Sequence, residues 1–247
     1  MAYLHETTRA DYQDLASGMV LHSAPGFPAF PVRLAGEMFQ RALALRGNAR
    51  EDRPVVLWDP CCGSGYLLTV LAILHRSRIA AVLASDIGED ATRIAARNLA
   101  LLTRAGLSER AADLRERAER FDKPSYAAAA EAAGRIGREL AGEGGDVPHR
   151  VHRADVLDPG ELRAVIGERP PDIVVTDVPY GEQTAWLGPH GADGVPGMVR
   201  SLAAVLPADA VIALAARGRK VPLGALRPAA SFRIGTRAVA LIVPGRL

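Results

Sequence analysis

The sequence predicts an α/β fold in which helices cover both faces of a mostly parallel sheet. Three observations lead to this prediction. The chain has 247 residues, of which 49% are hydrophobic, and this is enough for the core of one α/β domain. Short apolar runs alternate with segments of helical period, as in proteins built from strand–helix–strand units. Four of the apolar runs end at an aspartate, at the edge where such sheets bind ligands.

Residues 1–50 are expected to form an N-terminal extension with one helix, packed on a catalytic domain of residues 51–247. The extension contains "HSAPGFPAFP", a cluster of proline, glycine and aromatic residues that we expect to form a lid or wall near the ligand. A helix is predicted over 32–46. Its apolar residues recur at helical spacing: Leu34, Met38, Ala42 and Leu45.

Strands and helices alternate along the rest of the chain. Strands are predicted where apolar runs stop abruptly, at 53–58, 80–86, 149–156, 171–178, 210–217 and 237–243. Helices are predicted between them, at 65–76, 89–102, 160–167 and 197–206. Residues 104–146 are charged, alanine-rich and mostly helical in period, and they are expected to form a solvated helical insertion.

Charge is distributed unevenly, although the formal net charge is only +2. No acidic residue follows Asp209, whereas these basic residues do: Arg217, Arg219, Lys220, Arg227, Arg233, Arg237 and Arg246. This segment is either a surface that faces phosphates or a chance feature of an arginine-rich protein. If it binds RNA, the expected contacts are Arg217, Arg219 and Lys220, together with Arg33 of the N-terminal segment.

The stretch "WDPCCGSGY" contains the two cysteines of the chain, Cys61 and Cys62, side by side. Adjacent cysteines do not build a disulfide framework, and a zinc site needs about four ligands, so no metal site is expected. The N-terminus has no secretion-signal pattern, and no apolar run reaches the ~18 residues that span a bilayer. A monomeric cytoplasmic protein without membrane contact is therefore expected.

The same stretch is typical of a ligand-binding loop. Gly63 and Gly65 let the backbone approach a ligand, and the helix that follows favours a negatively charged group at its start. Asp86 lies 21 residues after Gly65, a spacing at which a carboxylate accepts hydrogen bonds from ribose hydroxyls. A dinucleotide fits poorly, because its fingerprint needs glycine in place of Leu68 and because Asp59 would face the pyrophosphate.

S-adenosylmethionine (SAM) fits these residues better. Asp59 would bind its amino group, the loop amides its carboxylate, Asp86 its ribose and Asp155 its adenine amino group. Helix capping would explain one or two of the strand-end aspartates, but not all four. The predicted cofactor contacts are Asp59, Cys61, Gly63, Ser64, Gly65, Asp86, Ile87, Asp155 and Val156.

Two motifs resemble those of class I SAM-dependent methyltransferases. "DPCCGSGY" looks like their first motif, and "DVPYG" looks like the (D/N)-P-P-Y motif of amino-methyltransferases, with Val178 in place of the first proline. The resemblance covers residues 54–247. It implies a Rossmann-like sheet of seven strands, mostly parallel, with the last strand antiparallel.

A longer resemblance runs along nearly the whole chain. "VLHSAPGFPAFPVRLA", "RFDKPSY" and "RIGTRA" are similar to segments of the avilamycin-resistance methyltransferase family of actinomycetes. This resemblance implies methyl transfer to the exocyclic N2 of a guanine in 23S rRNA. It also implies 23S rRNA or the large ribosomal subunit as the partner, and resistance to orthosomycin antibiotics such as avilamycin.

The "DVPYG" motif supplies the expected catalytic residues, Asp177, Pro179 and Tyr180. The Asp177 carboxylate would accept a hydrogen of the target amino group, Pro179 would stiffen the turn, and Tyr180 would stack on the base for about 1–3 kcal/mol. Methylation of pyrimidine C5 normally needs a cysteine nucleophile, and the cysteines here lie in the cofactor loop. The two lysines of the chain, Lys123 and Lys220, are too few for the acid–base set of ribose methylation.

Two other functions stay open at this point. One is methylation of another amino group, such as N6 of adenine in DNA or a glutamine amide in a protein. The other is a non-catalytic SAM-binding module that contacts RNA. Intact Asp177, Pro179 and Tyr180 argue against the binding module, because binding alone does not need them.

Overall fold

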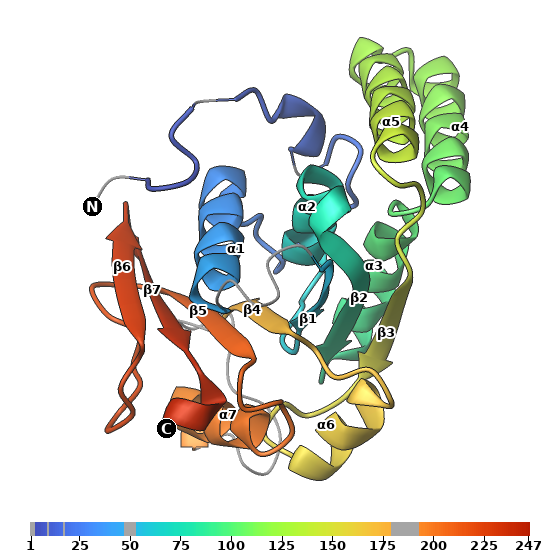
Figure 1. Cartoon of the computed structure of the whole chain (residues 1–247). Coiled ribbons are helices and arrows are strands. Elements are labelled where there is room, and N and C mark those ends of the chain that lie inside the picture. Colours follow the sequence, from blue (N-terminus) through green and yellow to red (C-terminus); the bar gives the residue numbers. More distant parts are fainter. Residues whose placement is uncertain (1–2, 9, 17, 47–52, 179–192) are drawn as a thin grey trace.

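The computed structural model describes residues 3–8, 10–16, 18–46, 53–178 and 193–247. These residues form a seven-stranded sheet in the order β3-β2-β1-β4-β5-β7-β6 (Figure 1). The pairs among β1 to β5 are parallel, whereas β7 runs antiparallel to both β5 and β6. The predicted sheet, mostly parallel with an antiparallel last strand, is confirmed.

The elements follow the predicted alternation. The strands are β1 (Val55–Asp59), β2 (Ile79–Asp86), β3 (His149–Arg153), β4 (Ile173–Asp177), β5 (Val211–Arg217), β6 (Ala230–Ile234) and β7 (Arg237–Ile242). The α-helices are α1 (Val32–Arg46), α2 (Tyr66–Leu74), α3 (Glu89–Ala100), α4 (Arg104–Phe121), α5 (Pro124–Gly142), α6 (Pro159–Ile166) and α7 (Gly194–Ala203). Helix α1 has the predicted bounds.

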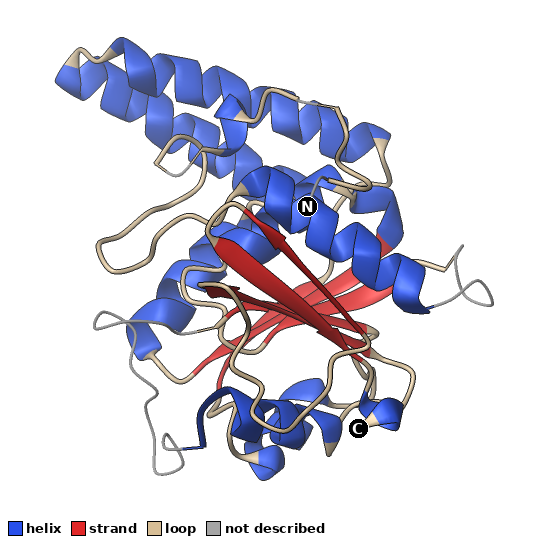
Figure 2. Cartoon of the chain, turned by 90° about the vertical axis from the view of Figure 1, so that its left-hand side faces the viewer, coloured by secondary structure: helices blue, strands red, loops and turns tan. Residues whose placement is uncertain are grey.

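Alternating strand residues fill a core on each face of the sheet, as the period of two requires. Leu57, Val82 and Val175 pack on the face covered by α1, α2 and α3. Trp58, Leu83 and Val174 pack on the opposite face against α6 and α7. Figure 2 shows the sheet between these two helical layers. Both faces are buried, which explains why the central strands are continuously apolar.

Helices α4 and α5 form an antiparallel hairpin between α3 and β3. Arg110 of α4 donates to the carbonyl oxygen of Val20 (2.9 Å), and Arg135 of α5 pairs with Asp14 (2.8 Å). The hairpin is therefore fastened to the N-terminal segment by hydrogen bonds as well as by apolar contacts. None of the described helices combines the length and apolar character needed to cross a membrane.

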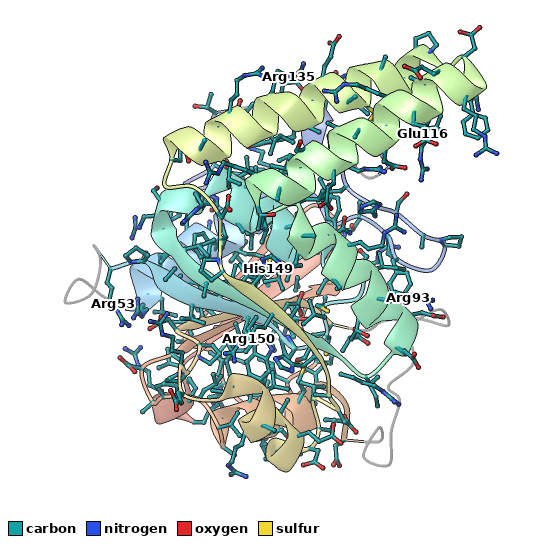
Figure 3. All side chains as sticks on the ribbon, turned by 90° about the vertical axis from the view of Figure 1, so that its right-hand side faces the viewer. Arg53, Arg93, Glu116, Arg135, His149 and Arg150 are labelled. Atoms are coloured by element: carbon teal, nitrogen blue, oxygen red, sulfur yellow. The ribbon has the colours of Figure 1, made fainter. Side chains whose placement is uncertain are left out.

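Figure 3 shows on which side of the molecule the hairpin turn lies. Arg53, just before β1, marks the amino end of the parallel strands, and Arg93 in α3 lies on the opposite side. Glu116, near the end of α4, lies on the side of Arg93. The turn between α4 and α5 therefore projects on the side of the carboxyl ends of the strands.

Strand β6 was not predicted. It is the last strand of the sheet and pairs with β7 alone, and of its residues only Phe232 is buried. A strand paired on one side and largely exposed needs little apolar sequence, so "ASFRI" gives a weak signal. The predicted strand at 149–156 is also shorter, because the chain turns at Asp155, whose carboxylate accepts the N–H of Leu157.

The segment before α1 is anchored by a buried carboxylate. Glu37, which is 0% exposed, accepts the backbone N–H groups of Leu4 (2.7 Å), His5 (2.9 Å) and Glu6 (2.9 Å). Arg41 donates to the same carboxylate at 2.7 Å. Burial alone would raise the pKa of Glu37, but these donors outweigh it and lower the pKa to about 2.

We expect Glu37→Gln to destabilise the chain by about 1.5–3 kcal/mol near neutral pH, because hydrogen bonds to a charged acceptor are lost. Since the pKa is depressed in the folded state, the stabilisation is complete above the ordinary pKa of 4.5 and disappears as the pH falls toward about 2. Urea unfolding at neutral and acidic pH measures this, with the exposed Glu116→Gln as the control. Equal stability of Glu37→Gln and wild type at neutral pH would contradict the role.

Candidate functional site

The candidate site lies at the carboxyl ends of the parallel strands. Asp59 ends β1, Asp86 ends β2 and Asp177 ends β4, while Asp155 follows β3 by two residues. Parallel strands bring these ends to one edge of the sheet. The charges of Asp86 and Asp177 both act on Asp59, which shows that the carboxylates are close neighbours.

The loop between β1 and α2 is shaped by two glycines. Gly63 has φ +51°, and its N–H donates to Oδ2 of Asp86 at 2.9 Å. Gly65 has φ +72°, and a Cβ there would lie 2.9 Å from Leu99 Cδ1 and 3.0 Å from Ala95 Cα. A side chain at this position would be strained and would also push α2 away from α3. The loop therefore presents backbone, not side chains, at the end of β1.

The start of α2 adds hydrogen-bond donors to this edge. Gly65 is its N-cap, and the first intrahelical bond runs from the N–H of Thr69 to the carbonyl oxygen of Gly65 at 3.0 Å. The N–H groups of the residues between them have no carbonyl within the helix to bind. Together with the positive end of the helix dipole they favour an anionic group such as a carboxylate.

Asp59 is the most buried acid of the site, with 2% exposure. Its Oδ1 accepts the N–H of Cys61 at 3.0 Å. Burial raises the pKa of Asp59 to about 8, and the charges of Asp86 and Asp177 add to the increase. A carboxylate that is costly to ionise alone is a favourable partner for a cation, whose charge offsets that cost.

A cleft of about 530 Å³ opens at the ends of β2 and β3, lined by Ile87, Asp155, Glu161 and Val165 among others. Glu161 accepts the backbone N–H of Asp155 at 2.7 Å, which holds the loop after β3 in place. At its β2 end, Oδ1 of Asp86 accepts the N–H of Gly88 at 2.9 Å. A carboxylate has about four acceptor positions, so Asp86 retains capacity for hydroxyl donors. His152 and Arg153 also line the cleft, so it combines apolar walls with polar and charged groups, which suits a nucleoside.

The N-terminal segment forms a wall beside the loop after β1. Asn98 of α3 donates to the carbonyl oxygens of Ser64 (2.8 Å) and His22 (3.0 Å), and its Oδ1 accepts the N–H of His22 (2.7 Å). A Cβ on Gly63 would lie 3.4 Å from the Phe27 ring, so this ring flanks the loop. Nothing in the sequence distinguished Asn98, a buried polar residue inside an amphipathic helix, from a surface asparagine.

The two cysteines have no reactive environment. Cys62 is buried and Cys61 is half-buried. Burial raises the pKa of both thiols well above the usual range, and the neighbouring acids add to it, so neither is a ready thiolate nucleophile. The described residues contain no group of three or more His, Cys, Asp or Glu side chains arranged to hold a metal ion.

Asp177, the carboxylate predicted to be catalytic, is paired with Arg237. Nη2 of Arg237 at the start of β7 donates to Oδ2 of Asp177 at 3.1 Å. The sequence placed Arg237 only in the basic C-terminal segment and gave no signal of this pair. The other two predicted catalytic residues, Pro179 and Tyr180, lie outside the described residues.

Comparisons with known proteins agree with this geometry. The family model described as rRNA methyltransferase AviRa matches residues 1–237. A curated relative from Streptomyces viridochromogenes, named 23S rRNA (guanine(2535)-N(1))-methyltransferase, is 54% identical over 241 residues, covering 98% of this chain and 95% of the relative. Two solved structures of the rRNA methyltransferase aviRa from the same organism, at 1.5 Å and 2.4 Å, superpose with a TM-score of 0.91 and cover 99% of this chain and 97% of theirs, at 50% and 52% identity.

The chain belongs to the AviRa rRNA methyltransferase family. The resemblance stated from the sequence motifs is therefore confirmed, and so is the class I methyltransferase fold. The cofactor expected from the sequence, SAM, is confirmed by this membership. The carboxyl edge fits it chemically, because it combines buried acids, free helix-start amides and a cleft for a nucleoside.

In this AviRa family member the predicted RNA contacts differ in their surroundings. Nε of Arg33 donates to the carbonyl oxygen of Glu6 at 2.8 Å, and its guanidinium lies 3.8 Å from the centre of the Tyr3 ring. These contacts give Arg33 a structural role within the N-terminal segment. Arg217, Arg219 and Lys220 are exposed and follow directly on the carboxyl end of β5, at the edge that carries the acids.

Proposed function

We propose that the chain transfers a methyl group from SAM to N1 of a guanine in 23S rRNA. The observation that carries this proposal is the match, at 54% identity over 98% of the chain, to a relative whose name states that reaction. The acid-lined edge supports it, because the loop after β1 and the Asp177 carboxylate lie at neighbouring strand ends.

The position of the methyl group is revised from the expectation. The family resemblance implied the exocyclic N2, and the "DVPYG" motif an amino nitrogen, whereas the relative is named as an N1 enzyme. Both nitrogens lie next to each other on the same edge of guanine, and both carry hydrogens that a carboxylate can accept. The motif therefore identifies the chemistry of the acceptor, but it does not decide between the two nitrogens.

The residues of the edge divide naturally among the parts of the cofactor. We assign the amino group to Asp59, the carboxylate to the amides at Ser64 and the start of α2, and the ribose to Asp86. The Cys61 amide already donates to Asp59 and helps to hold that carboxylate. Ile87, Asp155 and Val156 would hold the adenine in the cleft. When bound there, SAM supplies an electrophilic methyl group on a positively charged sulfur.

Asp177 is the proposed proton acceptor. N1 of neutral guanine carries a hydrogen, and its lone pair is delocalised, so it becomes a good nucleophile only when that proton leaves. The N1–H bond breaks toward the Asp177 carboxylate, the N1 electron pair bonds to the methyl carbon, and the electron pair of the broken carbon–sulfur bond stays on sulfur. Proton transfer by a positioned side chain typically contributes about 10²–10⁴ in rate. Pro179 and Tyr180 keep their proposed roles in stiffening the turn and stacking on the base.

The RNA is proposed to approach the carboxyl side of the sheet. Arg219 and Lys220 are exposed there, and the turn of the α4–α5 hairpin projects on the same side (Figure 3). Phe121 at that turn is 51% exposed, with the Arg120 guanidinium 5.3 Å from its ring centre. Exposed aromatic and basic side chains are the groups that hold unpaired bases and phosphates.

A monomeric state and a cytoplasmic location stay predictions, as does resistance to orthosomycin antibiotics.

We expect Arg219→Ala combined with Lys220→Ala to weaken RNA binding and to flatten its dependence on salt, because each lost phosphate contact lowers the salt slope by about one. The control is Arg169→Ala combined with Arg246→Ala, which removes two exposed charges from the amino end of the parallel strands. Fluorescence titration of an rRNA fragment across a salt series measures both. A salt slope equal to that of wild type in the first variant would remove this loop from the interface.

The proposed reaction is tested with purified protein, methyl-labelled SAM and three acceptors: 23S rRNA, duplex DNA and a glutamine-containing peptide. Mass spectrometry of nucleosides from the digested RNA should show 1-methylguanosine. A 2-methylguanosine product would restore the exocyclic target, and label in DNA or peptide would support the other amino-methyltransferase readings. Absence of label in all three acceptors would contradict a methyltransferase and favour the binding module.

A further inference from the structure

Arg237 lies at the carboxyl ends of the parallel strands because β7 runs antiparallel to them. Its strand pairs with β5 in the register Arg217↔Arg237, so the first residue of β7 meets the last residue of β5. Asp177, the last residue of β4, pairs with Ala215, two residues before the end of β5. The one strand that runs the other way thus places a basic residue among the acids of the site.

The Arg237 side chain is held on two sides. Its Nη2 donates to Oδ2 of Asp177 at 3.1 Å, and the guanidinium carbon lies 4.9 Å from the centre of the Phe30 ring. The side chain of Arg237 is 8% exposed and that of Asp177 is 20% exposed. Phe30 belongs to the N-terminal wall and is buried. Arg237 is thereby fixed between the carboxylate and an aromatic face.

Other basic residues of the C-terminal segment have different surroundings. Arg219 and Lys220 are exposed, and so is Arg233, which pairs in register with Ala238 on the neighbouring strand. Only a small part of the Arg237–Asp177 pair reaches water, so its interaction is screened less than that of a surface pair. The exposed residues of the segment suit contact with RNA phosphates. Arg237, which is buried against Asp177, differs from them.

The proposed reaction indicates a role for the Arg237–Asp177 pair. Asp177 must be ionised to accept the N1 proton, and an ionised Asp59 on β1 works against this because the two charges repel each other. Two cations face the same edge, Arg217 at the end of β5 and Arg237 at the start of β7. Of these, Arg237 makes the hydrogen bond that also fixes the orientation of the carboxylate.

We propose that Arg237 is a positioning residue for methyl transfer, which holds the Asp177 carboxylate ionised and aimed at the substrate base while Phe30 fixes the guanidinium. This inference rests on the proposed guanine-N1 activity. It assigns Arg237 a function distinct from phosphate binding, and it makes the N-terminal wall part of the catalytic support through Phe30.

The test compares Arg237→Gln and Arg237→Lys with wild type, and uses the exposed Arg233→Gln as the matched control. Rates of 1-methylguanosine formation on 23S rRNA are measured across a pH series, together with KM for RNA, Kd for SAM and Tm. We expect Arg237→Gln to lower kcat by about 10–100-fold while KM and Kd stay nearly unchanged. The acid limb of its pH–rate profile should move to higher pH, because a carboxylate without its cation ionises less readily.

Arg237→Lys keeps the charge but loses the planar fork. We expect its acid limb to stay at the wild-type position and its kcat to lie between those of wild type and Arg237→Gln. If Arg237→Gln folds poorly, Arg237→Lys still tests the inference. Arg233→Gln should behave as wild type. An unchanged pH profile in Arg237→Gln, or the same shift in Arg237→Lys, overturns the inference, while a wild-type enzyme that forms no 1-methylguanosine overturns the proposed function instead.

Discussion

Asp177→Asn is expected to lower kcat for methyl transfer by about 10²–10⁴-fold, because the asparagine amide cannot accept the N1 proton. The substitution keeps the shape of the side chain and an acceptor oxygen for Arg237, whose hydrogen bond to Asp177 is 3.1 Å long. The fold should therefore survive, whereas Asp177→Ala would leave a largely buried guanidinium without its carboxylate. Asparagine is for this reason the sharper substitution.

The measurement pairs single-turnover methyl transfer with calorimetric titration of SAM. SAM affinity should stay close to that of wild type, because Asp177 faces the substrate and not the cofactor in the proposed arrangement. The exposed Glu168→Gln, at the opposite edge, is the control for the loss of one negative charge. Wild-type turnover in Asp177→Asn would remove the residue from the mechanism, and a large loss of SAM binding would move it to the cofactor site.

Asp86→Ala is expected to raise the Kd for SAM by about 10–100-fold, since a hydrogen bond to a charged acceptor is worth about 1.5–3 kcal/mol. The carboxylate also accepts the N–H groups of Gly63 and Gly88, both at 2.9 Å. Its removal therefore loosens the loop after β1 and the turn after β2, in addition to losing the ribose contact. Both effects act on the cofactor and neither acts directly on RNA.

Asp90→Ala is the matched control for this prediction, because Asp90 lies four residues further on and its side chain is 75% exposed. Calorimetry gives the Kd for SAM, and thermal unfolding without SAM shows whether the fold is intact. If Asp86→Ala binds SAM as tightly as Asp90→Ala does, the assignment of the ribose to Asp86 is wrong.

The sequence predicts the central part of the fold well because local and tertiary signals agree there. The apolar runs that form β1, β2, β4 and β5 are buried on both faces of the sheet, so they stand out from their surroundings. The aspartates that end β1, β2 and β4 mark the carboxyl ends of the strands without any knowledge of tertiary structure. Strand β6 lacks such a signal because it is largely exposed, with Phe232 as its single buried residue.

The side-chain partners within the site were much harder to predict. Asn98 binds His22 across 76 residues of sequence, and Arg237 binds Asp177 across 60. Such pairs depend on the order of the strands and on the antiparallel course of β7, which no local pattern encodes. Arg33 shows the same limit, because no local pattern indicates its contacts with backbone carbonyls and with the Tyr3 ring.

The central claim is that the acidic carboxyl edge of the sheet binds SAM as the methyl donor. Calorimetric titration of the purified chain with SAM tests it most directly, without requiring the RNA substrate. Binding at these strand ends should give a saturable heat with one binding site, together with a rise in Tm as SAM is added. No heat and no change in Tm at high SAM concentration would contradict it.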